Sequence, residues 1–318
     1  MVQLGYTLSS EEFRPRELAE QARRAEEVGF TYALISDHFH PWLDSQGQSP
    51  FVWSTLGGVA MATERLVLGT GVTCPIIRYP PVILAQAVAT IADMMPGRFF
   101  LGVGTGEYLN EHITGEHWPP ISLRREMLVE AVDIMRELWD GGYTTHYGDF
   151  YTVENARIYT LPEELPPVYV AASGTESAQL AGAIGDGLIS TSPDAETVQT
   201  FDQAGGEGKP KYGQMTVCWG KDEEQAKKTA TEIWGYTALP GQLSQELALP
   251  AYFEQATQII TPEQATKHIV CGPDTQKYID QIQTYADAGF THVYIHQIGP
   301  DQEGFLTFAQ RELLPKYS

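Results

Sequence analysis

The densest group of reactive side chains lies in the segment SDHFHPW, which contains Asp37, His38, His40 and Trp42. An imidazole can move a proton near neutral pH or bind a metal ion, and an indole can cover an apolar carbon. Three interpretations stay open for this segment. The histidines act in acid–base chemistry, they hydrogen-bond loop backbone, or His38 and His40 begin a hydrolytic metal centre. A metal would need further ligands, for which Glu107 and His296 are the plausible residues.

Two glycine-bearing segments leave room for a flat ring. GTGVTCP contains Gly71 and Val72, and GVGTGE contains Thr105 and Gly106 before the carboxylate of Glu107. Without bulky side chains, a heterocycle can approach the backbone closely, and Glu107 can hydrogen-bond it or carry a proton. The spacing is not that of the dinucleotide-binding fingerprint. Tight strand-to-helix turns that need glycine are the structural alternative.

A third segment, AASGTES, combines small residues with a predicted helix start near Thr175. Backbone amides at a helix start hold phosphate groups, and the alternative is a simple N-cap by Ser173 or Thr175. The following strand ends in STSP. Thr191 and Ser192 there offer neutral hydrogen-bonding groups.

These segments all end apolar runs of strand length, which alternate with helical periods along nearly the whole chain. The pattern predicts one (β/α)8 TIM barrel over residues 1–318, with a doubly wound open sheet as the alternative. Functional side chains of a barrel sit at the carboxyl ends of its strands. Residues 148–159 look irregular, 196–204 form a weaker helix, and 235–266, with three prolines, look like an insertion that shapes substrate access. The predicted strands are residues 2–8, 32–38, 65–72, 98–107, 166–173, 187–192, 212–220 and 292–298.

The composition excludes several classes of function. With 41 acidic against 20 basic residues, the formal charge of −21 opposes binding to nucleic acid or anionic membranes. No run reaches the length of a membrane span, and the N-terminus lacks a signal-peptide pattern. The cysteines, at 74, 218 and 271, form no CxxC pair, so neither a disulfide framework nor a structural zinc site is indicated. A cytoplasmic protein is expected.

Taken in order, SDHFHPW, TGVTCPIIRYPP, GRFFLGVGTGEYLNE and VAASGTESAQLAGAIGDGLISTS resemble the deazaflavin-dependent branch of the bacterial-luciferase-like family. The chain looks most like the F420-dependent glucose-6-phosphate dehydrogenases, and HFHPW and TCPI also resemble the F420-dependent secondary-alcohol dehydrogenases. The resemblance implies a barrel that binds coenzyme F420, transfers a hydride from a CH–OH group to the deazaflavin C5, and assembles as a homodimer. An FMN-dependent monooxygenase of the same fold and a metal-dependent hydrolase using His38 and His40 are the alternatives.

The same resemblance implies roles for individual residues. His38 would orient or deprotonate the substrate hydroxyl, Trp42 would cover the reacting carbon, and Glu107 would interact with the deazaflavin near N1. The peptide Gly71–Val72 matches a non-proline cis bond of the relatives. The cofactor would be lined by Asp37, Gly71, Val72, Thr105, Gly106, Asn110, Ala172, Ser173, Gly174 and Thr175.

The substrate is where the chain departs from the glucose-6-phosphate dehydrogenases, which hold the phosphate with three basic side chains. After the sixth strand this chain has Pro193 and Asp194, and between Lys228 and Lys267 it has no lysine or arginine. Of those three phosphate-binding cations, this chain can then replace one, with Lys267. We therefore expect a neutral sugar, polyol or secondary alcohol.

Thr191, Ser192 and Lys267 are the expected substrate-binding residues. Glucose 6-phosphate is the alternative substrate, and it requires other arginines to supply the missing charge. Arg78 and Arg157 are the candidates for that replacement.

Overall fold

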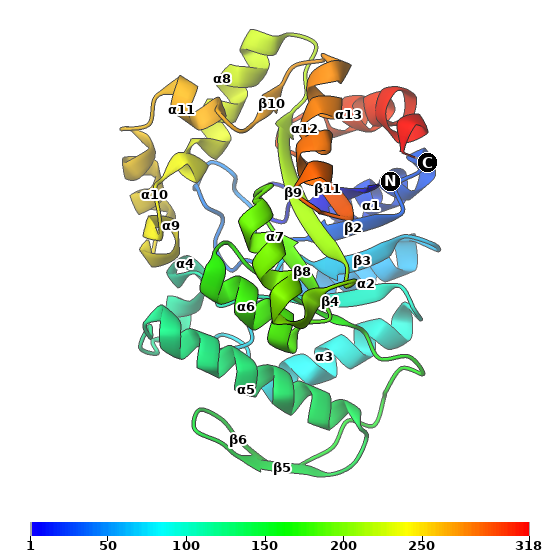
Figure 1. The fold of residues 1–318 in the computed structure, drawn as a ribbon, viewed down its shortest axis with the longest axis vertical. Helices are drawn as coiled ribbons and strands as arrows, with labels where there is room; N and C mark the ends of the chain where they lie inside the picture. The colour runs from blue at the N-terminus through cyan, green and yellow to red at the C-terminus, as the bar shows by residue number, and fades with distance from the viewer. Residues whose placement is uncertain (1, 318) are drawn as a thin grey trace.

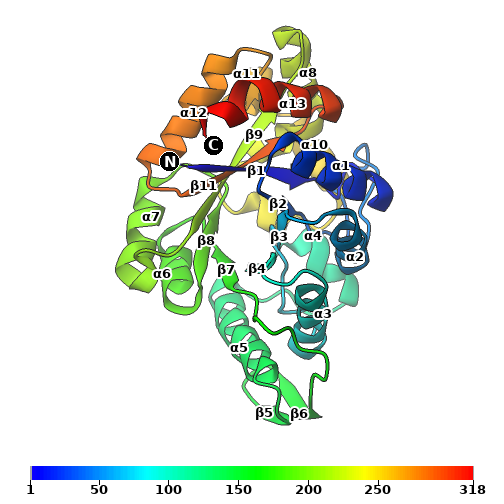
Figure 2. The same cartoon turned by 90° about the vertical axis from the view of Figure 1, so that its right-hand side faces the viewer.

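The computed structural model describes residues 2–317. Within that range nine strands form one sheet in the order β10-β9-β11-β1-β2-β3-β4-β7-β8, and pairing of β8 with β9 closes it into a ring. The two-residue strand β10 (Val270–Cys271) pairs with the end of β9 outside the ring. The predicted (β/α)8 barrel is confirmed, and the open sheet is wrong (Figure 2). The barrel strands are β1 (Gln3–Leu8), β2 (Tyr32–Ile35), β3 (Val67–Thr70), β4 (Phe99–Val103), β7 (Val168–Ala171), β8 (Gly187–Ser190), β9 (Lys211–Cys218) and β11 (His292–Gln297).

Helices surround this ring (Figure 1). The first helix shows why they form: Leu18, Ala22 and Ala25 are spaced to share one face and are fully buried. Pro15 begins that helix and Gly29, at φ 115°, ends it in the left-handed region. None of the described helices is long and apolar enough to cross a membrane. The larger helices are α1 (Pro15–Val28), α2 (Val52–Ala62), α3 (Pro81–Met94), α5 (Ile121–Trp139), α6 (Thr175–Ile184), α7 (Ala195–Phe201), α8 (Glu223–Trp234), α12 (Thr275–Asp287) and α13 (Gln302–Phe308).

The inside of the barrel is filled unevenly along its axis. An aromatic cluster that includes Tyr32, Phe100, Tyr212 and Tyr294 fills the interior. Since alternate strand residues face the same way, Tyr294 inside places His296 inside as well, nearer the carboxyl end. The interior near that end carries smaller groups such as Thr7, Gly71 and Gly104. Space for ligands is therefore expected at the carboxyl ends of the strands.

Two stretches differ in detail from expectation. Residues 148–159 are only partly irregular, because they contain β6 (Thr152–Ala156), which pairs with β5 (Thr144–Tyr147) as an antiparallel hairpin. Glu130 of α5 anchors the hairpin turn by accepting the amides of residues 149–151. This hairpin projects beyond α5 at one end of the molecule (Figure 2). The predicted helix at 196–204 is α7, which continues into a π-helical turn at Asp202–Gly206.

Residues 235–266 join α8 to β10 and contain no strand among the described elements. Prolines begin two of its helices, where a missing amide proton costs no hydrogen bond. Figure 1 shows this segment, with α9 and α10, to one side of the ring of strands and close to α4 (Tyr108–Glu111). Its helices are η3 (Gly235–Ala238), α9 (Leu243–Glu246), α10 (Pro250–Thr257) and α11 (Pro262–Thr266).

Candidate active site

His38 follows β2 and is held on three sides. Its Nδ1 lies 3.3 Å from the backbone oxygen of His40, its Nε2 lies 3.5 Å from Glu11 Oε1, and its ring meets the Trp42 ring edge-on with centroids 4.9 Å apart. Both ring nitrogens therefore face oxygen atoms that accept hydrogen bonds, and Nε2 is the one that lies beside a carboxylate. The geometry therefore presents His38 Nε2 as a base with a carboxylate beside it.

Glu11, which sequence analysis missed, lies in the loop after β1. Only 2% of its surface is exposed, and its Oε2 accepts hydrogen bonds from Ser9 Oγ at 3.0 Å and Ser36 Oγ at 2.7 Å. Its Oε1 is buried without a hydrogen-bond partner among the described residues. That oxygen faces His38, so it can stabilise an imidazolium there. The signal available in the sequence was its position three residues after the first predicted strand.

Glu107 is the N-cap residue of α4, and Asn110 connects it to the loop of His38. The Asn110 amide donates to Glu107 Oε2 at 3.3 Å, and its Oδ1 accepts the backbone amides of Phe39 at 2.9 Å and His40 at 3.3 Å. Both ends of this buried side chain are thus used inside the protein. Asn110 acts in this structure as the link between the two loops that carry His38 and Glu107.

Asp37 is likewise occupied by protein groups. Its Oδ2 accepts from Thr73 Oγ1 at 2.8 Å, and its Oδ1 accepts from Arg78 at 3.0 Å and from the Tyr79 hydroxyl at 3.1 Å. Thr73 directly follows the Gly71–Val72 peptide, which is cis. Asp37 therefore fixes the loop after β3.

Arg78 has a second carboxylate partner in Glu111. Its backbone amide donates to Glu111 Oε2 at 2.8 Å, and its Nε lies 3.6 Å from Glu111 Oε1. Burial raises the pKa of Glu111 to about 7, although the nearby Arg78 acts in the opposite direction. One buried cation thus joins Asp37, after β2, to Glu111, after β4.

The glycine-bearing turns after β3 and β4 fit a flat ring. A Cβ on Gly104 would lie 2.8 Å from Val72 Cγ2, and one on Gly106 would lie 2.5 Å from Cys74 Sγ. The glycines are therefore required where the two turns pack together. Gly71, Val72 and Thr105 stay partly exposed, so a planar heterocycle can lie against this backbone.

The start of α6 has a different cap from the one expected. Gly174 is the N-cap residue, and Ser177 Oγ accepts the amides of Ser173 and Gly174, each at 3.2 Å. The proposed caps Ser173 and Thr175 are therefore wrong, because Ser177 reaches back to these amides. The side chains of Ser173 and Thr175 are exposed and Ala172 is buried, an arrangement compatible with an anionic group at the helix start.

Comparison with known proteins fits this geometry. Residues 1–292 match the model of the family described as luciferase-like monooxygenase. The chain belongs to the luciferase-like family. Two similar relatives are named F420-dependent glucose-6-phosphate dehydrogenase: that of Nakamurella multipartita is 38% identical over 99% of this chain and 96% of its own, and that of Nocardia farcinica is 38% identical over 99% and 98%.

Solved structures place this luciferase-like chain in the same fold. An F420-dependent secondary alcohol dehydrogenase in complex with an F420-acetone adduct superposes with a TM-score of 0.92 at 30% identity, covering 98% of each chain. The coenzyme F420-dependent tetrahydromethanopterin reductase of Methanopyrus kandleri gives a TM-score of 0.82 at 20% identity, covering 100% of this chain and 99% of its own. The second likeness shows the fold alone.

The two arginines considered as phosphate ligands make other contacts in this luciferase-like barrel. Arg78 is buried between Asp37 and Glu111, and Arg157 lies over the rings of Tyr143 and Tyr159, beside the distant β5–β6 hairpin. Neither supplies the missing charge. Of the predicted substrate-binding residues, Thr191 and Ser192 are exposed after β8, and Lys267 is exposed at the end of α11.

His296 is buried at the end of β11 and is not a cation. Its Nδ1 lies 3.4 Å from Gln214 Nε2, and its ring meets Trp234 edge-on with centroids 4.6 Å apart. Burial lowers its pKa to about 4, so the imidazole is neutral at physiological pH. Within residues 2–317, no group of three or more His, Cys, Asp or Glu is arranged to hold a metal ion. The metal interpretation of His38 and His40 therefore lacks a ligand set in the described structure.

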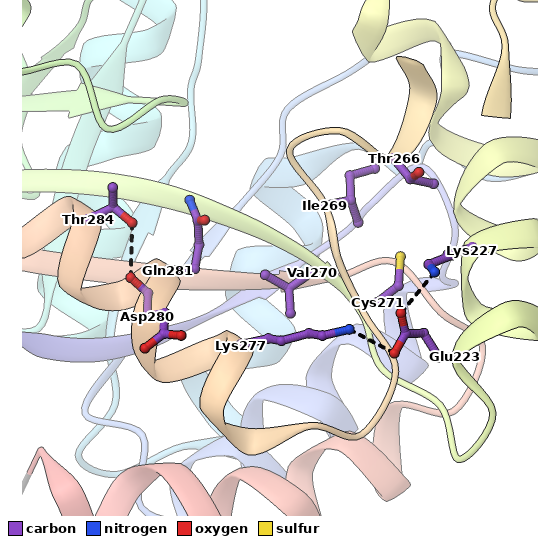
Figure 3. Close-up of a pocket in the computed structure, with 10 residues that line it drawn as sticks. All are labelled: Glu223, Lys227, Thr266, Ile269, Val270, Cys271, Lys277, Asp280, Gln281 and Thr284. Atoms are coloured by element: carbon purple, nitrogen blue, oxygen red, sulfur yellow. Dashed lines mark hydrogen bonds and ion pairs between the residues drawn. The ribbon is translucent and has the colours of Figure 1, made fainter. Parts of the chain in front are cut away.

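A cavity of about 380 Å³ lies between α8, β10 and α12 (Figure 3). Two lysines line it, but both pair with one carboxylate. Glu223 Oε1 lies 2.9 Å from Lys227 Nζ, and Glu223 Oε2 lies 2.7 Å from Lys277 Nζ. Lys227 Nζ also lies 2.9 Å from Glu224 Oε1, so two carboxylates balance the two lysines. The lining comes from the helices and β10, not from the loops that carry His38 and Glu107.

Proposed function

We propose that this luciferase-like protein is a coenzyme F420-dependent dehydrogenase that removes a hydride from a neutral CH–OH substrate. The observation that carries the proposal is His38 Nε2, which lies beside the buried Glu11 carboxylate and next to Trp42. Relatives named as F420-dependent dehydrogenases cover nearly the whole chain at 38% identity. A carboxylate-paired base suits an alcohol, because the hydroxyl must lose its proton as the hydride leaves.

Several residues of the chain have separate roles in the proposed reaction. Deazaflavin, when bound, supplies the carbon that accepts the hydride. Nε2 of His38 takes the hydroxyl proton, and Glu11 stabilises the resulting imidazolium. Trp42 keeps water from the reacting carbon. Glu107 provides a hydrogen bond or proton to the cofactor, from a position fixed by Asn110.

Cofactor identity is the direct test of this proposal. The purified protein should bind F420 with a Kd in the micromolar range or below, and FMN poorly. NADP should also bind poorly, because no dinucleotide fingerprint is present. Titration with each cofactor, followed by fluorescence, measures this. Tight FMN binding with oxygen consumption would support the monooxygenase alternative instead.

The preference for a neutral substrate rests on the charges near the strand ends. Asp194, after β8, is an N-cap that accepts the amides of Glu196 and Thr197, so its charge is fixed there. Phosphate binding would require three basic side chains, and for these the chain offers one exposed candidate, Lys267. A free sugar, a polyol or a secondary alcohol therefore suits this site better than a dianionic ester.

Assays of F420 reduction should show this preference directly. Two lost charge-assisted hydrogen bonds, at about 1.5 to 3 kcal/mol each, weaken affinity for the phosphate by roughly two to four powers of ten. We therefore expect kcat/KM for glucose or 2-propanol to equal or exceed that for glucose 6-phosphate. A specificity constant for the ester more than about tenfold above both neutral compounds, a gap of about 1.4 kcal/mol, contradicts the neutral-substrate proposal.

We also propose a cytoplasmic homodimer. Large apolar side chains are exposed on or beside α2 and α3, the most exposed being Met61 at 82% and Phe51 at 57%. Ile83 and Met94 add to this apolar surface. Exposed apolar side chains on two neighbouring helices suit an interface between subunits. The absence of a membrane-crossing helix in the described structure is compatible with this location.

A further inference from the structure

Two groups of side chains connect segment 235–266 to the loops near His38 and Glu107, in addition to its apolar packing against α8 and the end of β9. The first is aromatic. Trp42, in the loop after β2, stacks on Tyr236 with centroids 5.1 Å apart and meets Phe253 edge-on, also at 5.1 Å. This group attaches the segment to the loop that carries His38.

The second group is centred on one carboxylate, Glu246, at the end of α9. Its Oε1 lies 3.3 Å from an Arg124 terminal nitrogen, and its Oε2 accepts the Trp118 indole proton at 3.1 Å. The Arg124 guanidinium also lies 4.0 Å from the centroid of the Trp118 ring. A single side chain of the segment thus binds a cation and an indole on the β4–α5 side of the barrel.

Arg124 continues this contact toward the site. The same guanidinium donates to the backbone oxygens of Thr105 at 3.3 Å and Gly106 at 3.2 Å, the two residues directly before Glu107. Its side chain is 1% exposed, whereas that of Glu246 is 48% exposed. The buried arginine is therefore a fixed part of the barrel, and Glu246 is the partner that can leave.

We propose that Glu246 is the latch that holds segment 235–266 closed beside the strand ends, and that Arg124 couples this closure to the position of Glu107. When the latch opens, Arg124 loses its carboxylate partner, and the carbonyl groups of residues 105 and 106 share the guanidinium with water. Arg124 and Glu246 are thus positioning residues for Glu107. The coupling to catalysis rests on the proposed function, whereas the latch itself does not.

Glu246→Gln tests the latch with little risk to folding, because the side chain is half-exposed. Glutamine keeps an acceptor for Trp118 and loses the charge that pairs with Arg124. The segment has no lysine or arginine between residues 228 and 267, so chymotrypsin is the suitable probe, with Leu243 and Tyr252 exposed. We expect chymotrypsin to cut the variant within this segment about tenfold faster, as the loss of one charged hydrogen bond implies.

Glu254→Gln is the matched control. Glu254 lies on α10 of the same segment and has no ion pair in the described structure. Its replacement should leave the cleavage rate unchanged. High salt should speed cleavage of the unmodified protein and of the control, but not of Glu246→Gln, because salt screens a half-exposed ion pair.

Stopped-flow fluorescence then tests the coupling. We expect F420 to dissociate about tenfold faster from Glu246→Gln, with kcat reduced more than KM is raised, because Glu107 is less well placed. Cleavage and F420 dissociation equal to those of the control overturn the proposal. Faster cleavage with unchanged kcat retains the latch and overturns the coupling. Failure of the unmodified protein to bind F420 overturns the proposed function, while the cleavage result still decides the latch.

Discussion

His38→Ala is expected to lower turnover by about 10²-fold or more while F420 stays bound, which is the usual effect of losing an acid–base group. The physical reason is the pairing of His38 Nε2 with Glu11 Oε1 at 3.5 Å, which no other imidazole at the site has. Without it, the substrate proton must pass to water. Steady-state F420 reduction gives kcat, and fluorescence titration gives cofactor affinity separately.

His40→Ala is the matched control for this variant. Its Nδ1 donates to the Leu109 backbone oxygen at 2.9 Å, and its ring stacks on His112 with centroids 5.6 Å apart. These contacts support the loop, so a milder loss is expected. Equal losses in the two variants, or unchanged turnover in His38→Ala, would remove His38 from the mechanism.

Arg78→Leu is expected to destabilise the fold by about 3 to 5 kcal/mol, because it leaves two buried carboxylates without their shared cation. Asp37 and Glu111 each lie against Arg78 and are nearly inaccessible to solvent. Urea denaturation followed by fluorescence measures the loss. Arg125→Leu is the control, since Arg125 pairs with the exposed Glu176 and should cost less than about 1 kcal/mol.

The loss in Arg78→Leu should shrink as the pH falls. Burial already holds the Glu111 pKa at about 7, above its ordinary value of 4.5, and removing Arg78 raises it further. A carboxyl group with a raised pKa in the folded state binds more protons there than in the unfolded chain, so stability increases as pH falls toward the unfolded value. A loss that is constant from pH 8 to pH 5 would show that the missing cation is not its cause.

The barrel could be predicted because its strands carry a strong signal. The run RFFLGVGTGE gave β4 and the loop after it, and PRELAEQARRAEEV gave α1 to the residue. The β5–β6 hairpin could not be found in the same way. Its burial alternates weakly, and its turn is ordered by Glu130, a residue far back in α5.

Residues of the candidate site could be proposed where they cluster in sequence and were missed where they converge only in space. His38, Trp42 and Glu107 stand in compact motifs after strands. Glu11 lies in an unremarkable SSEE segment, and its role depends on Ser36 and His38 in the next loop. Arg78 looked like a free cation, because nothing local shows that Asp37 and Glu111 enclose it.

The closure of the barrel also constrains how the protein folds. Since β11 lies between β9 and β1, the last strand of the ring pairs with the first. During synthesis β1 therefore waits with one unpaired edge until residues 292–297 have left the ribosome. Contacts this distant in sequence slow folding, and open strand edges invite association with other chains. The nascent chain thus keeps open strand edges until its final strand arrives.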